Sequence, residues 1–74
     1  MSIPPYWQVA QAIADLPILL SRERQRRGLS IRKAAAESRV AYHVYNRTES
    51  GALPTANHAI NLFAWLYESS LRDG

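Results

Sequence analysis

Residues 29–51 read LSIRKAAAESRVAYHVYNRTESG, and this stretch decides the fold. Ser30 is a good N-cap, so a helix is expected to begin after it and to continue to about Glu37. A turn over 38–41 and a second helix over 42–50 follow. Two short helices joined by a tight turn predict a helix-turn-helix, whose second helix can enter the major groove of DNA.

The side chains within this stretch suit close packing of the two helices. Ala34 and Ala35 are small enough for the second helix to cross the first closely, and Val40 is expected to fill the turn. The second helix must keep one face for the core, which leaves its opposite face free.

Outside this stretch, apolar residues recur at helical spacing, and the alternation typical of strands does not occur. We expect helices over 6–14, 16–27 and 56–69. Asp15 and Pro17 favour a break between the first two, and one continuous kinked helix is the alternative. The predicted fold class is all-α: a compact bundle of about five helices with a helix-turn-helix, plus an extra N-terminal helix.

The length of 74 residues allows one domain with short appendages. We expect an N-terminal extension at 1–15, the helix-turn-helix domain at 16–69 and a tail at 70–74. The expected inward residues of the flanking helices are Leu16, Leu19 and Leu20, then Ala59, Ile60, Phe63 and Leu66, with Leu62 and Trp65 beside them.

The composition argues against several classes of protein. There is no cysteine, so a disulfide framework and a thiolate metal site are excluded. The acidic and histidine residues lack the spacing of a nucleophile–base pair or a metal site, and no glycine-rich phosphate loop occurs. We expect no enzyme, no cofactor, no metal and no small-molecule substrate. The longest apolar run is too short to cross a bilayer, and no targeting segment is visible, so we expect a cytoplasmic protein without a membrane partner.

The net charge of +3 is unevenly distributed along the chain. Residues 22–47 contain eight of the nine basic residues and two of the six acidic ones, a local net charge of +6, and the remainder carries −3. This asymmetry indicates an anionic partner for part of the surface, with nucleic acid favoured over a membrane. A solvated basic helix face is the alternative.

Five short pieces of sequence, in this order, resemble the phage lambda repressor/Cro-like family, often called the XRE family. They are Arg24-x-x-x-Gly28-Leu29-Ser30, Ala35, Val40, Glu49-x-Gly51, and Pro54-Thr55 with the apolar stripe to Leu66. The resemblance covers about residues 16–67. It implies a five-helix bundle that binds double-stranded DNA and usually represses transcription, with Arg24 paired to Glu49.

Carried over by position, the family's base-reading residues fall on Tyr42, His43 and Arg47, with Asn46 and Val44 as additions. Arg47 suits guanine and Asn46 suits adenine. The candidate phosphate contacts are Ser30, Arg22, Arg26, Arg32 and Lys33. Tyr45 falls at the family's inward aliphatic position, so the resemblance places it in the core with its hydroxyl group at the rim.

This sequence also departs from the family pattern at three positions. Ile31 stands where the family commonly has glutamine, and Thr48 stands where a larger aliphatic residue is usual. Arg39 stands where the family prefers glycine, which predicts a left-handed conformation at a non-glycine residue.

The sequence therefore predicts a sequence-specific regulator of transcription, a phage or bacterial repressor, that binds double-stranded DNA with the helix over 42–50. The alternative is a protein-interaction module, such as an antitoxin or anti-repressor, that uses the same face; nonspecific architectural binding is a third option. Homodimerisation would use the last helix (Leu62, Trp65, Tyr67) or the N-terminal helix (Tyr6, Trp7, Val9, Ile13), and a monomer on asymmetric sites remains open.

Overall fold

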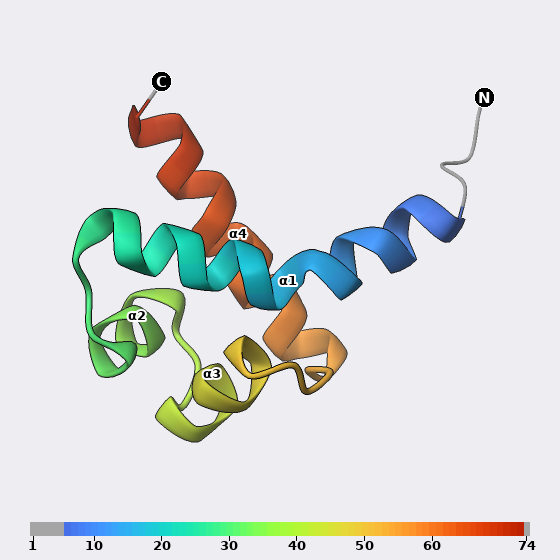
Figure 1. Cartoon of the computed structure of the whole chain (residues 1–74), viewed down its shortest axis with the longest axis horizontal. Helices are drawn as coiled ribbons and strands as arrows, with labels where there is room; N and C mark the ends of the chain where they lie inside the picture. The colour runs from blue at the N-terminus through green and yellow to red at the C-terminus, as the bar shows by residue number, and fades with distance from the viewer. Residues whose placement is uncertain (1–5, 74) are drawn as a thin grey trace.

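The computed structural model describes residues 6–73, which form four helices and no strand (Figure 1). The side chains of Val9 and of residues 69–73 are outside this description. The helices are α1 (Tyr6–Arg27), α2 (Ile31–Ser38), α3 (Tyr42–Glu49) and α4 (Ala56–Asp73). The predicted all-α bundle is confirmed.

The break expected near Asp15 does not occur, and α1 continues through Pro17 as a single helix. Leu16 and Leu20 lie one turn apart on the same side of α1, and both are fully buried. Keeping the helix continuous keeps this pair in one register against the bundle, which offsets the hydrogen bond that proline cannot donate. The alternative expectation, one continuous helix, is confirmed.

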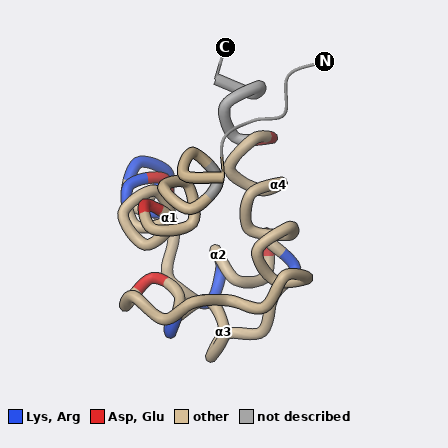
Figure 2. Tube along the Cα trace, turned by 90° about the vertical axis from the view of Figure 1, so that its right-hand side faces the viewer, with Lys and Arg blue, Asp and Glu red and all other residues tan. Residues whose placement is uncertain are grey.

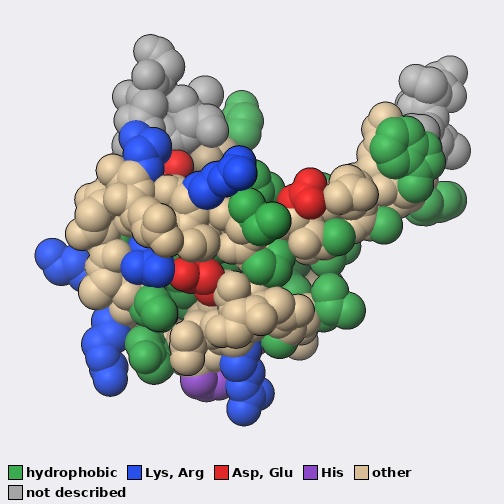
Figure 3. All heavy atoms as spheres, in the orientation of Figure 1, with side chains coloured by type: hydrophobic (Ala, Val, Ile, Leu, Met, Phe, Trp, Pro, Cys, Tyr) green, Lys and Arg blue, Asp and Glu red, His purple; other side chains and the backbone are tan. Residues whose placement is uncertain are grey.

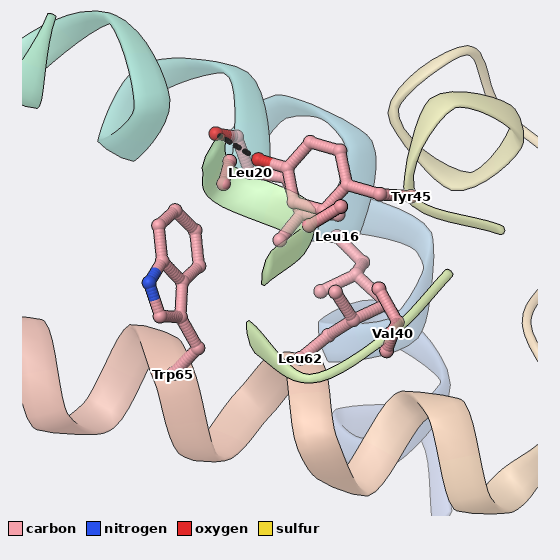
Figure 4. Close-up of a cluster of buried hydrophobic side chains, with 8 residues drawn as sticks. Leu16, Leu20, Val40, Tyr45, Leu62 and Trp65 are labelled. Carbon is pink, nitrogen blue, oxygen red and sulfur yellow. Dashed lines mark hydrogen bonds between the residues drawn. The ribbon is translucent and has the colours of Figure 1, made fainter. Parts of the chain in front are cut away.

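The core lies where all four helices meet (Figure 4). Leu16 and Leu20 of α1 face Tyr45 of α3, with Leu62 and Trp65 of α4 closing the other side. The remaining core residues are Ala34 and Ala35 of α2, and Val40. The predicted packing of the small residues Ala34 and Ala35, and the predicted burial of Val40 at the turn, are therefore confirmed.

The inward face of α4 differs from the expected one. Leu62 and Trp65 form it, whereas Ile60 is 65% exposed, and Phe63 and Leu66 are only partly buried. Apolar residues cover more than half of the circumference of α4, so their spacing alone does not decide which side packs inward. Leu19 of α1 was also expected inside, and it is 38% exposed. The reason is the same, because apolar residues occupy more than one side of α1 as well.

The first turns of α1 extend beyond the bundle (Figures 1 and 3). Tyr6 is 85% exposed and Trp7 is 67% exposed. At the other end of the chain, α4 runs to Asp73, past its expected end at residue 69. Within the described residues, no helix combines the length and the apolar character that crossing a membrane would require.

Candidate nucleic-acid interface

The connection between α2 and α3 is closed by hydrogen bonds of its own backbone. Ser30 caps α2 by accepting a hydrogen bond from the amide of Lys33 at 3.1 Å. At the other end of α2, Arg39 adopts a left-handed conformation with φ of 62°. Its amide donates to the carbonyl of Ala36 at 3.2 Å, and the amide of Val40 donates to the carbonyl of Ala35 at 3.1 Å. The predicted cap and left-handed residue are confirmed, and together they set the direction in which α3 leaves the turn.

The inner side of α3 is held in the core by Tyr45 and Thr48, both buried. The hydroxyl of Tyr45 donates to the carbonyl of Leu20 at 3.2 Å, inside the bundle rather than at the rim as expected. Its ring and that of Trp65 form a T-shaped pair, with centroids 6.1 Å apart and an angle of 83° between the ring planes. These contacts fix the rotation of α3 about its own axis, and therefore which side chains it presents outward.

An ion pair joins the end of α3 to α1, as the resemblance implied. The Nε of Arg24 donates to both carboxylate oxygens of Glu49, at 3.2 and 3.0 Å, and its Nη2 donates to Oε1 at 2.7 Å. Its Nη1 donates to the carbonyl of Leu29 at 3.2 Å. The hydrogen bonds from Arg24 to Glu49 raise the pKa of the guanidinium above its ordinary value. One side chain therefore links α1, the loop before α2, and α3.

The outer side of α3 presents the four predicted base-reading residues together. Tyr42, His43 and Arg47 are exposed and Asn46 is half-buried. Their positions, i, i+1, i+4 and i+5, place them on one face of the helix. Figure 3 shows histidine and basic side chains at the lower edge of the molecule, where α3 lies. This face of α3 therefore presents hydrogen-bond donors and acceptors to solvent, while the opposite face of the helix is packed into the core.

Basic side chains at the start of α2 extend this face. The guanidinium of Arg32 lies over the ring of Tyr42, 4.5 Å from its centroid. Lys33 is exposed one residue further on, in the same first turn as the cap Ser30. The stacking of Arg32 on Tyr42 was missed at the sequence level because the residues are ten positions apart on different helices.

Two of the predicted phosphate contacts lie elsewhere. Arg22 and Arg26 are each two positions from Arg24, which turns them about 200° around α1 and away from α3. They line a groove between α1 and α4 instead. Arg26 also pairs with Glu23 at 2.5 Å.

The local excess of positive charge is consequently divided among several surfaces (Figure 2). Arg27 lies 2.8 Å from Glu23 and 2.9 Å from Glu37, and it stacks over Trp65. The basic residues that accompany the outer face of α3 are Arg32, Lys33 and Arg47. Among the described residues, no group of three or more histidine or acidic residues could hold a metal ion.

No family model, curated protein or solved structure matches this chain. Its function is therefore inferred from the geometry of α2 and α3 and from the chemistry of their outer side chains.

The buried hydroxyl of Tyr45 leads to a prediction for alkaline unfolding. Burial raises the pKa of Tyr45 above its ordinary value of 10.0, and the charge of Glu49 raises it further. The unfolded chain releases this proton at a lower pH than the folded chain. The contribution of Tyr45 to stability is thus complete below about pH 10 and lost above it, at up to about 1.4 kcal/mol per pH unit.

Tyr45→Phe tests this prediction. The variant should lose about 1 kcal/mol at neutral pH, through the missing bond to the carbonyl of Leu20. It should also show a shallower decline in unfolding free energy between about pH 10 and 11. Urea unfolding at several pH values measures both effects, and equal alkaline slopes for the two proteins would contradict the assignment.

Proposed function

We propose that this chain is a sequence-specific regulator of transcription, a repressor of phage or bacterial origin, that reads the major groove of double-stranded DNA with α3. The observation that carries the proposal is the division of α3 into two sides. Tyr45 and Thr48 are buried, whereas Tyr42, His43 and Arg47 are exposed on the reverse side. A helix of this width fits the major groove, where each base pair presents a distinct set of donors and acceptors.

The individual side chains have matching chemistry. Arg47 can donate two hydrogen bonds to O6 and N7 of guanine, and Asn46 can pair with N6 and N7 of adenine. His43 can donate or accept according to its protonation state. Contact of this kind would occupy an operator and exclude the polymerase.

Phosphate contacts would come from the first turn of α2. The DNA backbone beside the groove would be contacted by the amide groups of this turn and by Arg32 and Lys33. The hydroxyl of Ser30 would be a further phosphate contact. The stacking of Arg32 on Tyr42 restricts both side chains before binding, which lowers the entropy lost in the complex.

Arg47→Ala tests the role of α3 directly. A binding site is first obtained by selecting duplexes from a random pool, and affinity is then measured on that site. We expect Arg47→Ala to weaken binding about tenfold, or about 1.4 kcal/mol, and to relax the preference at one base pair. The matched control is Arg26→Ala, which removes the same charge from the far side of α1 and should change affinity less than twofold.

Each other result identifies a different class of protein. No duplex binding by micromolar protein at low salt would exclude DNA as the partner and favour the protein-interaction module. Equal affinity for random duplexes, with equal losses for Arg47→Ala and Arg26→Ala, would indicate nonspecific architectural binding.

A further inference from the structure

The outward side of α1 is a surface that the proposed DNA contact does not use. Leu16 and Leu20 define the inner side of this helix, and Ile18, two positions away, is 54% exposed on the outer side. Leu19 beside it lines the groove toward α4. In Figure 2, α1 is seen nearly end-on at one side of the bundle, with α4 on the other.

The apolar surface also continues from α1 onto α4. Leu19 shares a groove of about 550 Å³ with Phe63, Leu66 and Tyr67. Tyr67 is largely exposed. A partner lying along α1 would thus cover apolar side chains on both helices, including the exposed turns that carry Trp7.

The outer side of α1 carries one acidic and one basic residue that could pair with the same two residues of a second, antiparallel copy of the helix. Asp15 and Arg22 are seven residues apart, two turns, and so share one side of the helix. Asp15 accepts a hydrogen bond from Gln11 at 3.0 Å. Among residues 6–8 and 10–68, whose side chains the structure describes, no ion pair is recorded for Asp15 or Arg22. Figure 3 shows basic, apolar and acidic side chains in succession along the upper edge of α1.

We infer that a second copy of this chain packs antiparallel along the outward side of α1, around a two-fold axis between Ile18 and Leu19. This arrangement sets Asp15 of each copy opposite Arg22 of the other, so one charge pair is formed twice, as a two-fold interface requires. It also lays the first turns of each α1 along the other copy. The interface is separate from the outer face of α3, which leaves both copies free to bind DNA.

Charge reversal tests this arrangement on the full chain, in the absence of DNA. Sedimentation equilibrium should show a dimer for the unaltered protein at micromolar concentration. Asp15→Arg and Arg22→Asp should each raise the dimer dissociation constant at least tenfold, because each places two like-charged pairs in the interface. Mixing the two variants should restore dimers, since one copy then carries arginine at both positions and the other carries aspartate at both. The double variant Asp15→Arg/Arg22→Asp should restore them as well, because it exchanges the two charges within each pair.

The control is Leu53→Ser, which removes an apolar side chain that is 79% exposed between α3 and α4. It should leave the dissociation constant unchanged. An unaltered protein that is monomeric at hundreds of micromolar, or a failure of both the mixture and the double variant to recover dimers, would overturn the inference. Because no DNA is present, a dimer that binds no duplex would reject the proposed function alone, and a monomer that binds DNA would reject the interface alone.

Discussion

Trp65→Ala is expected to destabilise the folded chain by about 3–5 kcal/mol. The side chain of Trp65 is 4% exposed and lies between α4, α1 and α3 (Figure 4). A domain of this length has a total stability of only about 4–11 kcal/mol. The loss is therefore a large share of the total stability, and the unfolding midpoint of the variant should move to a much lower urea concentration.

The reason for so large a loss is the number of partners that this one indole has. Its ring forms a T-shaped pair with that of Tyr45, and its Nε1 donates to Glu37 at 3.1 Å. The guanidinium of Arg27 lies over it, 5.8 Å from the ring centroid. Alanine would leave a cavity at the junction of the helices and remove the covering of α3 on its inner side.

Urea unfolding followed by circular dichroism measures this effect at a protein concentration low enough for monomers. Trp7→Ala is the matched control, since Trp7 is exposed on the first turn of α1, and its loss should be below about 0.5 kcal/mol. Trp65→Phe should lie between the two because it keeps an aromatic ring in the same place. A loss under about 1 kcal/mol for Trp65→Ala would show that the indole does not support the core in this way.

The sequence predicts the helices well wherever a local signal determines an end. Ser30 begins α2 through its own hydroxyl, and Arg39 ends it in the left-handed conformation expected there. Pro17 is a local signal that misleads. The free-energy cost of a proline inside the helix is opposed by the free energy gained when Leu16 and Leu20 are buried. Only the tertiary packing shows which of the two is larger.

The faces of α1 and α4 could not be predicted with the same accuracy. Ile60 and Leu62 both belong to helical apolar stripes, and the approach of α1 decides that Leu62 is buried and Ile60 exposed. The same limit applies to the basic residues. Arg26 and Arg32 are equivalent in a charge count, but one lines the groove toward α4 and the other lies over Tyr42.

The four residues predicted on α3 do share a face, because an eight-residue helix with Tyr45 and Thr48 inside has only one outward side. Which bases they would read under the proposed function depends on how the protein would lie on the duplex, and no pattern within one chain specifies that. The packing of the chain determines the shape of this face, whereas the identity of its partner is not encoded in any local pattern.

Glu49→Ala is expected to cost about 2–3 kcal/mol, the second-largest effect among these predictions. The side chains of Arg24 and Glu49 are 20% and 12% exposed, so the remaining guanidinium would be largely shielded from water. It would keep only the bond to the carbonyl of Leu29. Glu68→Ala, which removes an exposed carboxylate from α4, is the control and should change stability by less than about 0.5 kcal/mol.

A double-mutant cycle separates the pair from its surroundings. If Arg24 and Glu49 act on each other, Arg24→Ala/Glu49→Ala should cost less than the sum of the single changes, by about 1–3 kcal/mol. Hydrogen exchange at the last turn of α3 should quicken in Glu49→Ala, because this ion pair is what joins that turn to α1. Additive single changes with unaltered exchange would mean that the buried residues Tyr45 and Thr48 hold α3 in place without the ion pair. The outer face would then be positioned from the core and not from the end of the helix.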